Sequence, residues 1–228
     1  MRIVIACLLS VAFVTLFPRV GAAEEYPMKD ITAYSAVDGV AIISRSTDAP
    51  FTLRIFGGNA EKTRAEDGQL WVDTGKRMFQ HVLAPMASFA PDESDLKKIL
   101  AAHAEWECGH HNELIQQTQK AKVVYEKVGK QEWAHWTYDM SGIWKHLKEE
   151  RPELAKNPRG PQTQHFLTTV VGKNVLVIIC TTMSGDNEEE SKKLLLESAA
   201  SLQKLAVPLS SGEIITYCEK PLKPSTQK

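Results

Sequence analysis

The stretch that decides the fold is residues 165–183, HFLTTVVGKNVLVIICTTM. Two segments, His165–Val171 and Val175–Met183, flank Gly172-Lys173-Asn174, a glycine-containing turn of the kind that joins antiparallel strands. The second segment is almost continuously apolar from Val175 to Cys180. The stretch therefore predicts a β-hairpin in the core of the protein.

Further strands are predicted on the N-terminal side of this hairpin. Residues 51–56 alternate apolar and polar side chains, which is the period of a half-buried strand. Asp73-Thr74-Gly75-Lys76 is a turn sequence between two short apolar segments, so it predicts a second hairpin. The predicted strands are residues 32–45, 51–56, 70–72, 77–83, 121–127 and 132–140, followed by the pair at 165–171 and 175–183.

Two long helices are predicted among the strands. The first begins near Pro91-Asp92-Glu93, where proline and acidic residues suit a first turn, and Gly109 ends or kinks it. The second covers residues 187–205 and begins with three glutamates at its positive end. Short sequential strands joined by tight turns favour an antiparallel sheet over repeated βαβ units. The fold class is therefore α+β, an antiparallel sheet with helices packed on its faces in an α/β/α sandwich.

The N-terminus indicates where the protein functions. Arg2 precedes a 15-residue apolar run, Ile3 to Phe17, and small residues at 21–23 follow it. This order is typical of a secretory signal peptide, and the run is short for a membrane span. The alternative is a single N-terminal membrane anchor. The predicted organisation is a signal peptide at 1–23, one α+β domain at 24–205 and a C-terminal tail at 206–228, which a disulfide would tether.

Composition excludes several classes of protein. Hydrophobic residues at 43% and charged residues at 24% are globular values, and no second apolar run could span a bilayer. The mature chain would carry 25 basic and 28 acidic residues, so no basic excess supports nucleic-acid binding. The sequence lacks the phosphate-loop, dinucleotide-loop and nucleophile-elbow motifs. No N-x-[ST] sequon occurs, which fits a periplasmic or secreted protein of a bacterial envelope.

The predicted location outside the cytoplasm decides which cysteines could form a disulfide. Cys7 would leave with the signal peptide, so Cys108, Cys180 and Cys218 would remain in an oxidising compartment. Cys180 sits inside an apolar strand, where cysteine most often behaves as a small buried hydrophobe. We therefore expect a Cys108–Cys218 disulfide that ties the tail to the body, with a free Cys108 as the alternative.

The densest group of metal-ligating residue types is residues 103–111, HAEWECGHH. In a helix that continued past Gly109, His103, Glu107, His110 and His111 would share one face. Such side chains ligate zinc, copper or nickel, but no full metal motif is present. A structural role is the preferred interpretation, and a metal site at Glu107, His110 and His111 is the alternative. No cofactor is expected.

A second group is residues 133–140, WAHWTYDM. Strand alternation places Trp133, His135 and Asp139 on one face, where they could line a groove and orient a ligand. The alternative is that Trp133 packs in the core beneath a helix. Residues 141–164 follow, with one amphipathic helical turn and then prolines that enforce an irregular path. A long loop of this kind is a common place for recognition, and a plain surface excursion is the alternative.

The order of the predicted elements resembles the PsbP-like fold family, whose members are secreted or lumenal α/β/α sandwiches, and the resemblance is densest in the C-terminal half. The residues that carry the resemblance are Val128-Gly129-Lys130-Gln131-Glu132-Trp133 leading into a strand, the hairpin at 165–183 and an acid-started helix ending in SAASLQKL. The resemblance spans roughly residues 31–205 and does not extend to the tail. It implies an accessory or binding domain in an extracytoplasmic assembly, with no catalytic residues to transfer.

Two functional hypotheses follow. The favoured one is a non-enzymatic periplasmic or secreted accessory protein that binds an envelope protein through its sheet edge, residues 141–164, or both. The alternative is a small extracytoplasmic metal-binding protein or metalloenzyme that uses the 103–111 cluster.

Overall fold

The computed structural model describes residues 31–66, 69–75, 77–115, 118–156 and 160–222. The signal peptide predicted at residues 1–23 lies outside these ranges. Within them, no helix combines the length and apolarity needed to cross a bilayer. The elements are β1 (Ile31–Ala36), β2 (Gly39–Ser44), β3 (Phe51–Phe56), β4 (Asn59–Glu66), β5 (Gln69–Asp73), β6 (Met78–Pro85), η2 (Met86–Ser88), α2 (Leu96–Ile115), β7 (Val124–Val128), β8 (Gln131–Asp139), α3 (Ser141–Glu150), η3 (Pro152–Lys156), β9 (Pro161–Val171), β10 (Asn174–Met183), α4 (Glu188–Ala200), β11 (Gln203–Lys204) and α5 (Ser211–Glu219).

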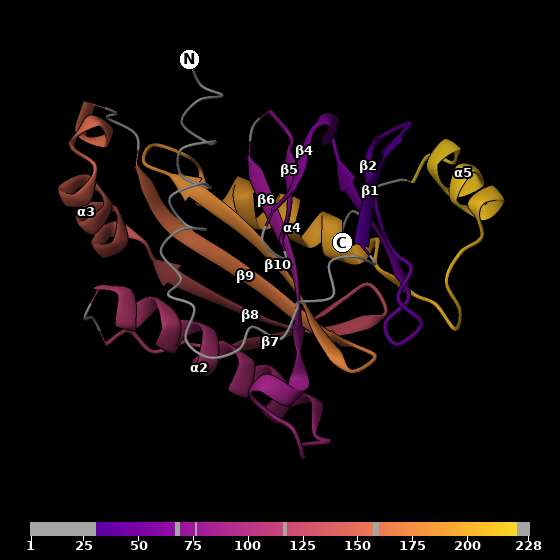
Figure 1. Ribbon diagram of the computed structural model, residues 1–228, viewed down its shortest axis with the longest axis horizontal. Helices are drawn as coiled ribbons and strands as arrows, with labels where there is room; N and C mark the ends of the chain where they lie inside the picture. The colour runs from indigo at the N-terminus through magenta and orange to yellow at the C-terminus, as the bar shows by residue number, and fades with distance from the viewer. Residues whose placement is uncertain (1–30, 67–68, 76, 116–117, 157–159, 223–228) are drawn as a thin grey trace.

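A seven-stranded antiparallel sheet forms the centre of the molecule, with strand order β4-β5-β6-β10-β9-β8-β7 (Figure 1). The predicted hairpin is its middle pair, β9 and β10, in which Val171 is opposite Asn174 across the turn. Val175 to Cys180 are buried with 4% exposure or less. The hairpin and the α+β fold class predicted from the sequence are therefore confirmed.

Helices α2 and α3 cover one face of this sheet. Their apolar side chains meet Trp136 of β8 and Phe166 of β9, whose rings stack with centroids 3.8 Å apart. Ile143, Trp144 and Leu147 recur at helical spacing and are the buried residues of α3. Burying side chains of this size stabilises the layer by about 1.5–3 kcal/mol each.

The opposite face is covered by α4 together with a second antiparallel sheet, of order β1-β2-β3-β11. Phe51 and Leu53 of that sheet, Trp133 of the large sheet and Leu195 of α4 share one core and are fully buried. Asn187 caps α4 by accepting from the amides of Glu189 and Glu190, as a helix N-terminus requires. Long helices on both faces were predicted, whereas the second sheet was not.

The prediction of one strand at residues 32–45 is wrong, because this segment forms two strands of the second sheet, β1 and β2. The chain reverses at Val37 and Asp38, and β1 then pairs with β2. Gly39 makes this reversal possible because a Cβ there would lie 2.1 Å from the carbonyl oxygen of Ile55. The dipeptide Asp38-Gly39 is a common turn signal, and it marked this boundary in the sequence.

Two further elements differ from the sequence prediction. Helix α2 continues through Gly109 to Ile115, because the buried neighbours Cys108 and His111 hold both sides of the glycine in the core. Strand β4 was not predicted, since its sequence NAEKTRAE has no apolar alternation. Its position at the edge of the sheet accounts for that polar composition.

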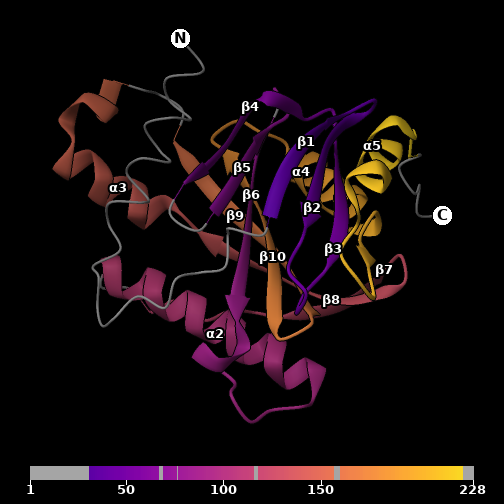
Figure 2. The same cartoon turned by 45° about the vertical axis from the view of Figure 1, so that its right-hand side comes forward.

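The predicted tail at 206–228 contains helix α5, which packs on the outer face of the small sheet (Figure 2). A fully buried guanidinium anchors it. Arg54 pairs with the Asp38 carboxylate and donates from Nη2 to the carbonyl of Tyr217 at 2.8 Å, and its Cζ lies 4.8 Å from the Tyr217 ring centroid. Asp38 also accepts from the amide of Leu222 at 2.6 Å. One ion pair thus holds the C-terminal end of α5.

Asp38→Asn is expected to destabilise the protein by about 2 kcal/mol, because it leaves the buried Arg54 without its counter-charge. Urea unfolding measures the loss, and hydrogen exchange should show faster exchange in α5 than in the large sheet. Glu197→Gln is the matched control, since Glu197 has the same 18% side-chain exposure but pairs with the exposed Lys193. The control should cost less than about 0.5 kcal/mol. Equal losses in the two variants would contradict the anchoring role of Arg54.

Candidate functional site

The predicted binding face at Trp133, His135 and Asp139 does not form a groove. Trp133 is fully buried beneath α4, so the packing alternative holds for this residue. The His135 ring is parallel to that of His165, with centroids 5.9 Å apart, and its Nδ1 lies 3.4 Å from Glu126. Asp139 is exposed and accepts from the amide of Ser141 at the start of α3.

The residues of the 103–111 cluster do not converge on a common point. His111 is buried against Tyr138, with ring centroids 4.8 Å apart. His110 instead packs on Trp106 at 4.4 Å, and one of its ring nitrogens lies 2.8 Å from the Trp106 carbonyl oxygen. Adjacent residues on a helix point about 100° apart, which separates these two rings.

Most side chains of the 103–111 cluster are packed against other residues of the fold. His103 is fully buried against Phe89, with ring centroids 5.1 Å apart. Burial raises the pKa of Glu107 to about 7, because the charged carboxylate loses its hydration. Throughout the part of the chain that the structure describes, no three His, Cys, Asp or Glu side chains are arranged to hold a metal ion. The metal alternative at Glu107, His110 and His111 therefore has no geometric support.

The predicted Cys108–Cys218 disulfide is wrong. Cys108, Cys180 and Cys218 are all free and buried. Cys108 belongs to the core under α2, where its Sγ lies 3.3 Å from the Gln119 carbonyl oxygen. Cys218 belongs to the core under α5, on the outer side of the small sheet. Two sheets lie between these layers, so the two sulfurs cannot bond.

The segment at 141–164 is not an open recognition loop where the structure describes it. Helix α3 buries three apolar side chains, and Gly160 lies against its Trp144. A Cβ at Gly160 would lie 2.1 Å from the indole nitrogen. The segment is thus packed onto the large sheet, and its recognition role has no geometric support.

A pocket of about 410 Å³ lies between α5 and β1. We call it the α5 groove; its lining residues are Tyr34, Ser35, Arg45, Ser211, Ile214, Ile215, Cys218 and Glu219. Strand β1 supplies Tyr34, and α5 supplies the apolar wall because Ile214 and Cys218 are four residues apart on one helix face. The α5 groove is thus a mainly apolar channel along the helix.

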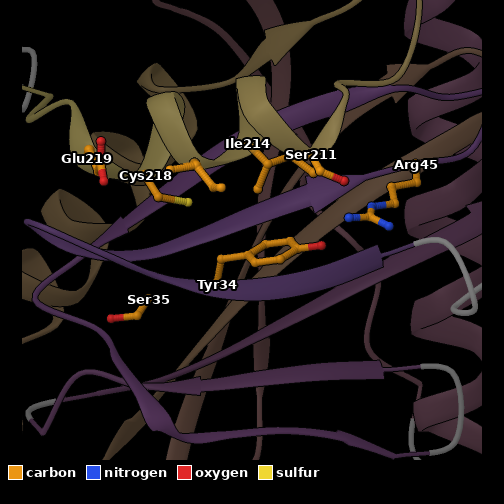
Figure 3. A pocket seen from close by; sticks show the side chains of 8 residues that line it. Tyr34, Ser35, Arg45, Ser211, Ile214, Cys218 and Glu219 are labelled. Atoms are coloured by element: carbon orange, nitrogen blue, oxygen red, sulfur yellow. The ribbon is translucent and has the colours of Figure 1, made fainter.

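The two ends of the α5 groove carry opposite charges. Figure 3 shows Ile214 and Cys218 pointing from α5 toward the side of Tyr34, with Arg45 near Ser211 at one end and Glu219 at the other. The Arg45 guanidinium carbon lies 6.0 Å from the centre of the Tyr34 ring. Burial raises the pKa of the Cys218 thiol, which favours its protonated form.

Three of the exposed apolar side chains belong to α5 or to segments next to it. The four large hydrophobic residues that stand out as exposed in the described chain are Val37, Val124, Val207 and Ile215. Ile215 lies on α5 and is 58% exposed, and the amide of Val37 donates to the Cys218 carbonyl at the end of α5. Val207 lies in the connection that leads into α5. Ile215 is the one of these residues that lines the groove among those the structure describes.

The α5 groove was missed in the sequence, although one signal for its helix was present. Ser210 and Glu213 form a capping box, in which each side chain bonds the backbone amide of the other residue. The pattern S-x-x-E before an apolar pair is a recognised helix start. The groove itself has no local signature, because β1 and α5 are about 180 residues apart in the chain.

No protein-family model matches this chain, and no curated protein matches its sequence. Among solved structures, it is similar to cyanobacterial PsbP (CyanoP) from Synechocystis sp. PCC 6803, with 12% identity and a TM-score of 0.41 over 82% of this chain and all of that one. A structure from Bacteroides thetaiotaomicron VPI-5482 has 13% identity and a TM-score of 0.38 over 72% of this chain. The match spans about half (52%) of the length of the Bacteroides protein. The PsbP-like resemblance seen in the sequence is thus found again as a distant similarity of fold.

Proposed function

We propose that this protein is a non-catalytic accessory protein outside the cytoplasm that binds a partner protein in the α5 groove. The observation that carries the proposal is the exposed apolar side chain of Ile215 in the lining of a groove of about 410 Å³. The chemistry-bearing clusters of the sequence, in contrast, are packed or paired within the fold. The proposed location follows from the signal peptide predicted at residues 1–23.

The groove defines the chemistry of the segment that it would bind. An apolar side chain of the partner would lie against Tyr34 and the exposed Ile215, where it would leave water for an apolar surface. Arg45 is exposed at one end and favours an acidic residue of the partner, whereas Glu219 favours a basic residue at the other. We therefore propose a short partner segment with an apolar centre and opposite charges at its two ends.

The test places a photo-activated cross-linking residue at position 215 of the full chain in cells. A specific cross-linked protein is expected from position 215, and cell fractionation checks the location in the same experiment. Position 124 is the matched control, because Val124 is 53% exposed but lies on β7, away from α5. The captured partner is then purified and titrated by calorimetry.

Ile215→Asp is expected to weaken binding of that partner at least tenfold, because it places a charge in the lining of the groove. Val124→Asp should leave the affinity unchanged. Both side chains are exposed, so neither change should alter the melting temperature by more than a few degrees. Equal affinities of the two variants, or equal cross-linking from positions 124 and 215, would refute the groove as the binding site.

A further inference from the structure

The edge of the large sheet carries a group of N–H donors that have no acceptor. Arg64 of β4 and Trp71 of β5 are directly opposite each other, and the guanidinium carbon lies 5.5 Å from the centre of the indole. The Nε and Nη2 of Arg64 and the Nε1 of Trp71 are buried, and no residue of the structure accepts a hydrogen bond from them. This cross-strand pair therefore has three unsatisfied donors. Two of them belong to the positively charged guanidinium of Arg64, and the third belongs to the neutral indole of Trp71.

This arrangement is costly unless something accepts those bonds. A buried donor without a partner costs about 1–3 kcal/mol, and a charged group costs more. The other well-buried guanidinium groups of the described chain meet carboxylates: Arg54 pairs with Asp38, and Arg77 lies 3.5 Å from Asp186. No ion pair is found for Arg64 among the described residues. Arg64, which is partly exposed, thus lacks the counter-charge that the buried Arg54 and Arg77 have.

The identity of the unsatisfied atoms indicates the kind of acceptor. Nε and Nη2 lie along one edge of the guanidinium, and that edge holds a carboxylate or phosphate through two parallel hydrogen bonds. Trp71 supplies a third donor beside it. On the same face, Gln80 is opposite Trp71 and donates to Gln69 at 2.6 Å, so two amide side chains flank the pair. The site offers donors and positive charge, and it therefore suits an anion with several oxygen acceptors.

The site lies at the edge of the large sheet. Strand β4 is the edge strand of the large sheet, and Arg64 is partly exposed. Helices α2 and α3 pack on β8 and β9, and Figure 1 shows them to the left of and below β4 and β5. The indole, at 7% exposure, provides an apolar floor.

We propose that Arg64 and Trp71 form a binding site for a small oxyanion. The anion would lie along the Nε and Nη2 edge of Arg64 and accept a third hydrogen bond from Trp71 Nε1. Carboxylates and phosphates share this chemistry. The site is separate from the α5 groove, since β4 and β5 supply none of the groove residues.

The experiment follows the indole N–H signals of the ¹⁵N-labelled full chain by NMR. The sequence has 5 tryptophans, and Trp71→Phe identifies the signal of Trp71 by its loss. Acetate and phosphate are titrated separately at constant ionic strength, with chloride as the reference salt. A saturable shift of the Trp71 N–H, larger than at the other indoles, is expected with at least one of the two oxyanions. The oxyanion that binds more tightly shows whether the site prefers a carboxylate or a phosphate.

Variants of Arg64 test whether anion binding needs the two parallel donors of the guanidinium or only a positive charge. Arg64→Met should abolish the saturable shift, and Arg64→Lys should weaken binding at least tenfold because an ammonium has no paired edge. Lys148→Met is the matched control, since it removes a cation 5.8 Å from the ring centre of another tryptophan, Trp144. The control should titrate like the wild type. Absence of a saturable Trp71 shift in the folded wild type, or an unchanged shift in Arg64→Met, would overturn the proposal.

Discussion

Acidification to about pH 5 is expected to destabilise this protein by several kcal/mol, because the folded state keeps several buried histidines neutral. Desolvation lowers the pKa of His81, His111 and His135 to about 4 and that of His103 to about 3. In the unfolded chain these groups titrate near 6.5. The unfolded state therefore binds more protons below pH 6.5, and the free energy of unfolding falls as the pH falls from 6.5 toward 4.

Glu107 acts in the opposite direction. Burial raises its pKa to about 7 from 4.5, so the folded state holds a proton that the unfolded chain releases above pH 4.5, and acidification favours the folded state. With four histidines against one carboxyl group, the unfolded state binds about three more protons than the folded state. Each of these protons changes the free energy of unfolding by about 1.4 kcal/mol per pH unit. The expected slope is about 4 kcal/mol per pH unit between about pH 6 and 5, against a stability of about 5–15 kcal/mol for a typical domain.

Urea unfolding at pH 7, 6 and 5 measures this slope. His103→Leu should reduce the slope by about 1.4 kcal/mol per pH unit, because His103 is buried with neither ring nitrogen hydrogen-bonded. His146→Gln is the control, since His146 lies on α3 with 37% side-chain exposure, and its slope should equal that of the wild type. A wild-type slope below about 1.4 kcal/mol per pH unit would mean that less than one net proton is taken up.

Gly172→Ala is expected to destabilise the protein by about 4 kcal/mol, through two effects that add. Gly172 has φ +59°, which costs a residue with a Cβ about 1–2 kcal/mol. A Cβ there would also lie 1.7 Å from the backbone oxygen of Asp48, in the connection between β2 and β3. The turn of the central hairpin and the small sheet would have to separate to accommodate it.

Gly57→Ala distinguishes these two effects. Gly57 has a similar φ of +67°, but no atom lies within 4 Å of its Cβ position. It should therefore cost only about 1–2 kcal/mol by urea unfolding at pH 7. If the two variants lose the same stability, the close approach of Asp48 to the hairpin turn does not contribute.

Local sequence signals predicted most of the large sheet. The turn at 172–174 and the apolar run after it identified β9 and β10, and the turn at 73–76 identified β5 and β6. Acidic residues after Asn187 identified the start of α4, because they oppose the dipole of that helix. These features lie within a few residues of one another, so the pattern of the chain specifies them directly.

Contacts between distant segments decided the rest. The 103–111 cluster has metal-ligating residue types, yet the helix directs His110 and His111 to different surroundings. Cys108 and Cys218 were predicted to form a disulfide because Cys7 and Cys180 had been assigned elsewhere. In the fold they belong to separate cores under α2 and α5. The unsatisfied Arg64 edge arises where β4 pairs with β5 at the edge of the sheet, and the polar sequence of β4 did not predict that strand.

By itself, the sequence determined the α+β class, the central hairpin and the two long helices that cover the large sheet. The tertiary structure alone decided that α5 packs on a second sheet, which residues line its groove and which donors lack an acceptor. The physical reason is the range of the interactions. Turns, caps and apolar periodicity act over a few residues, whereas burial and pairing of a side chain depend on which layer the folded chain places against it.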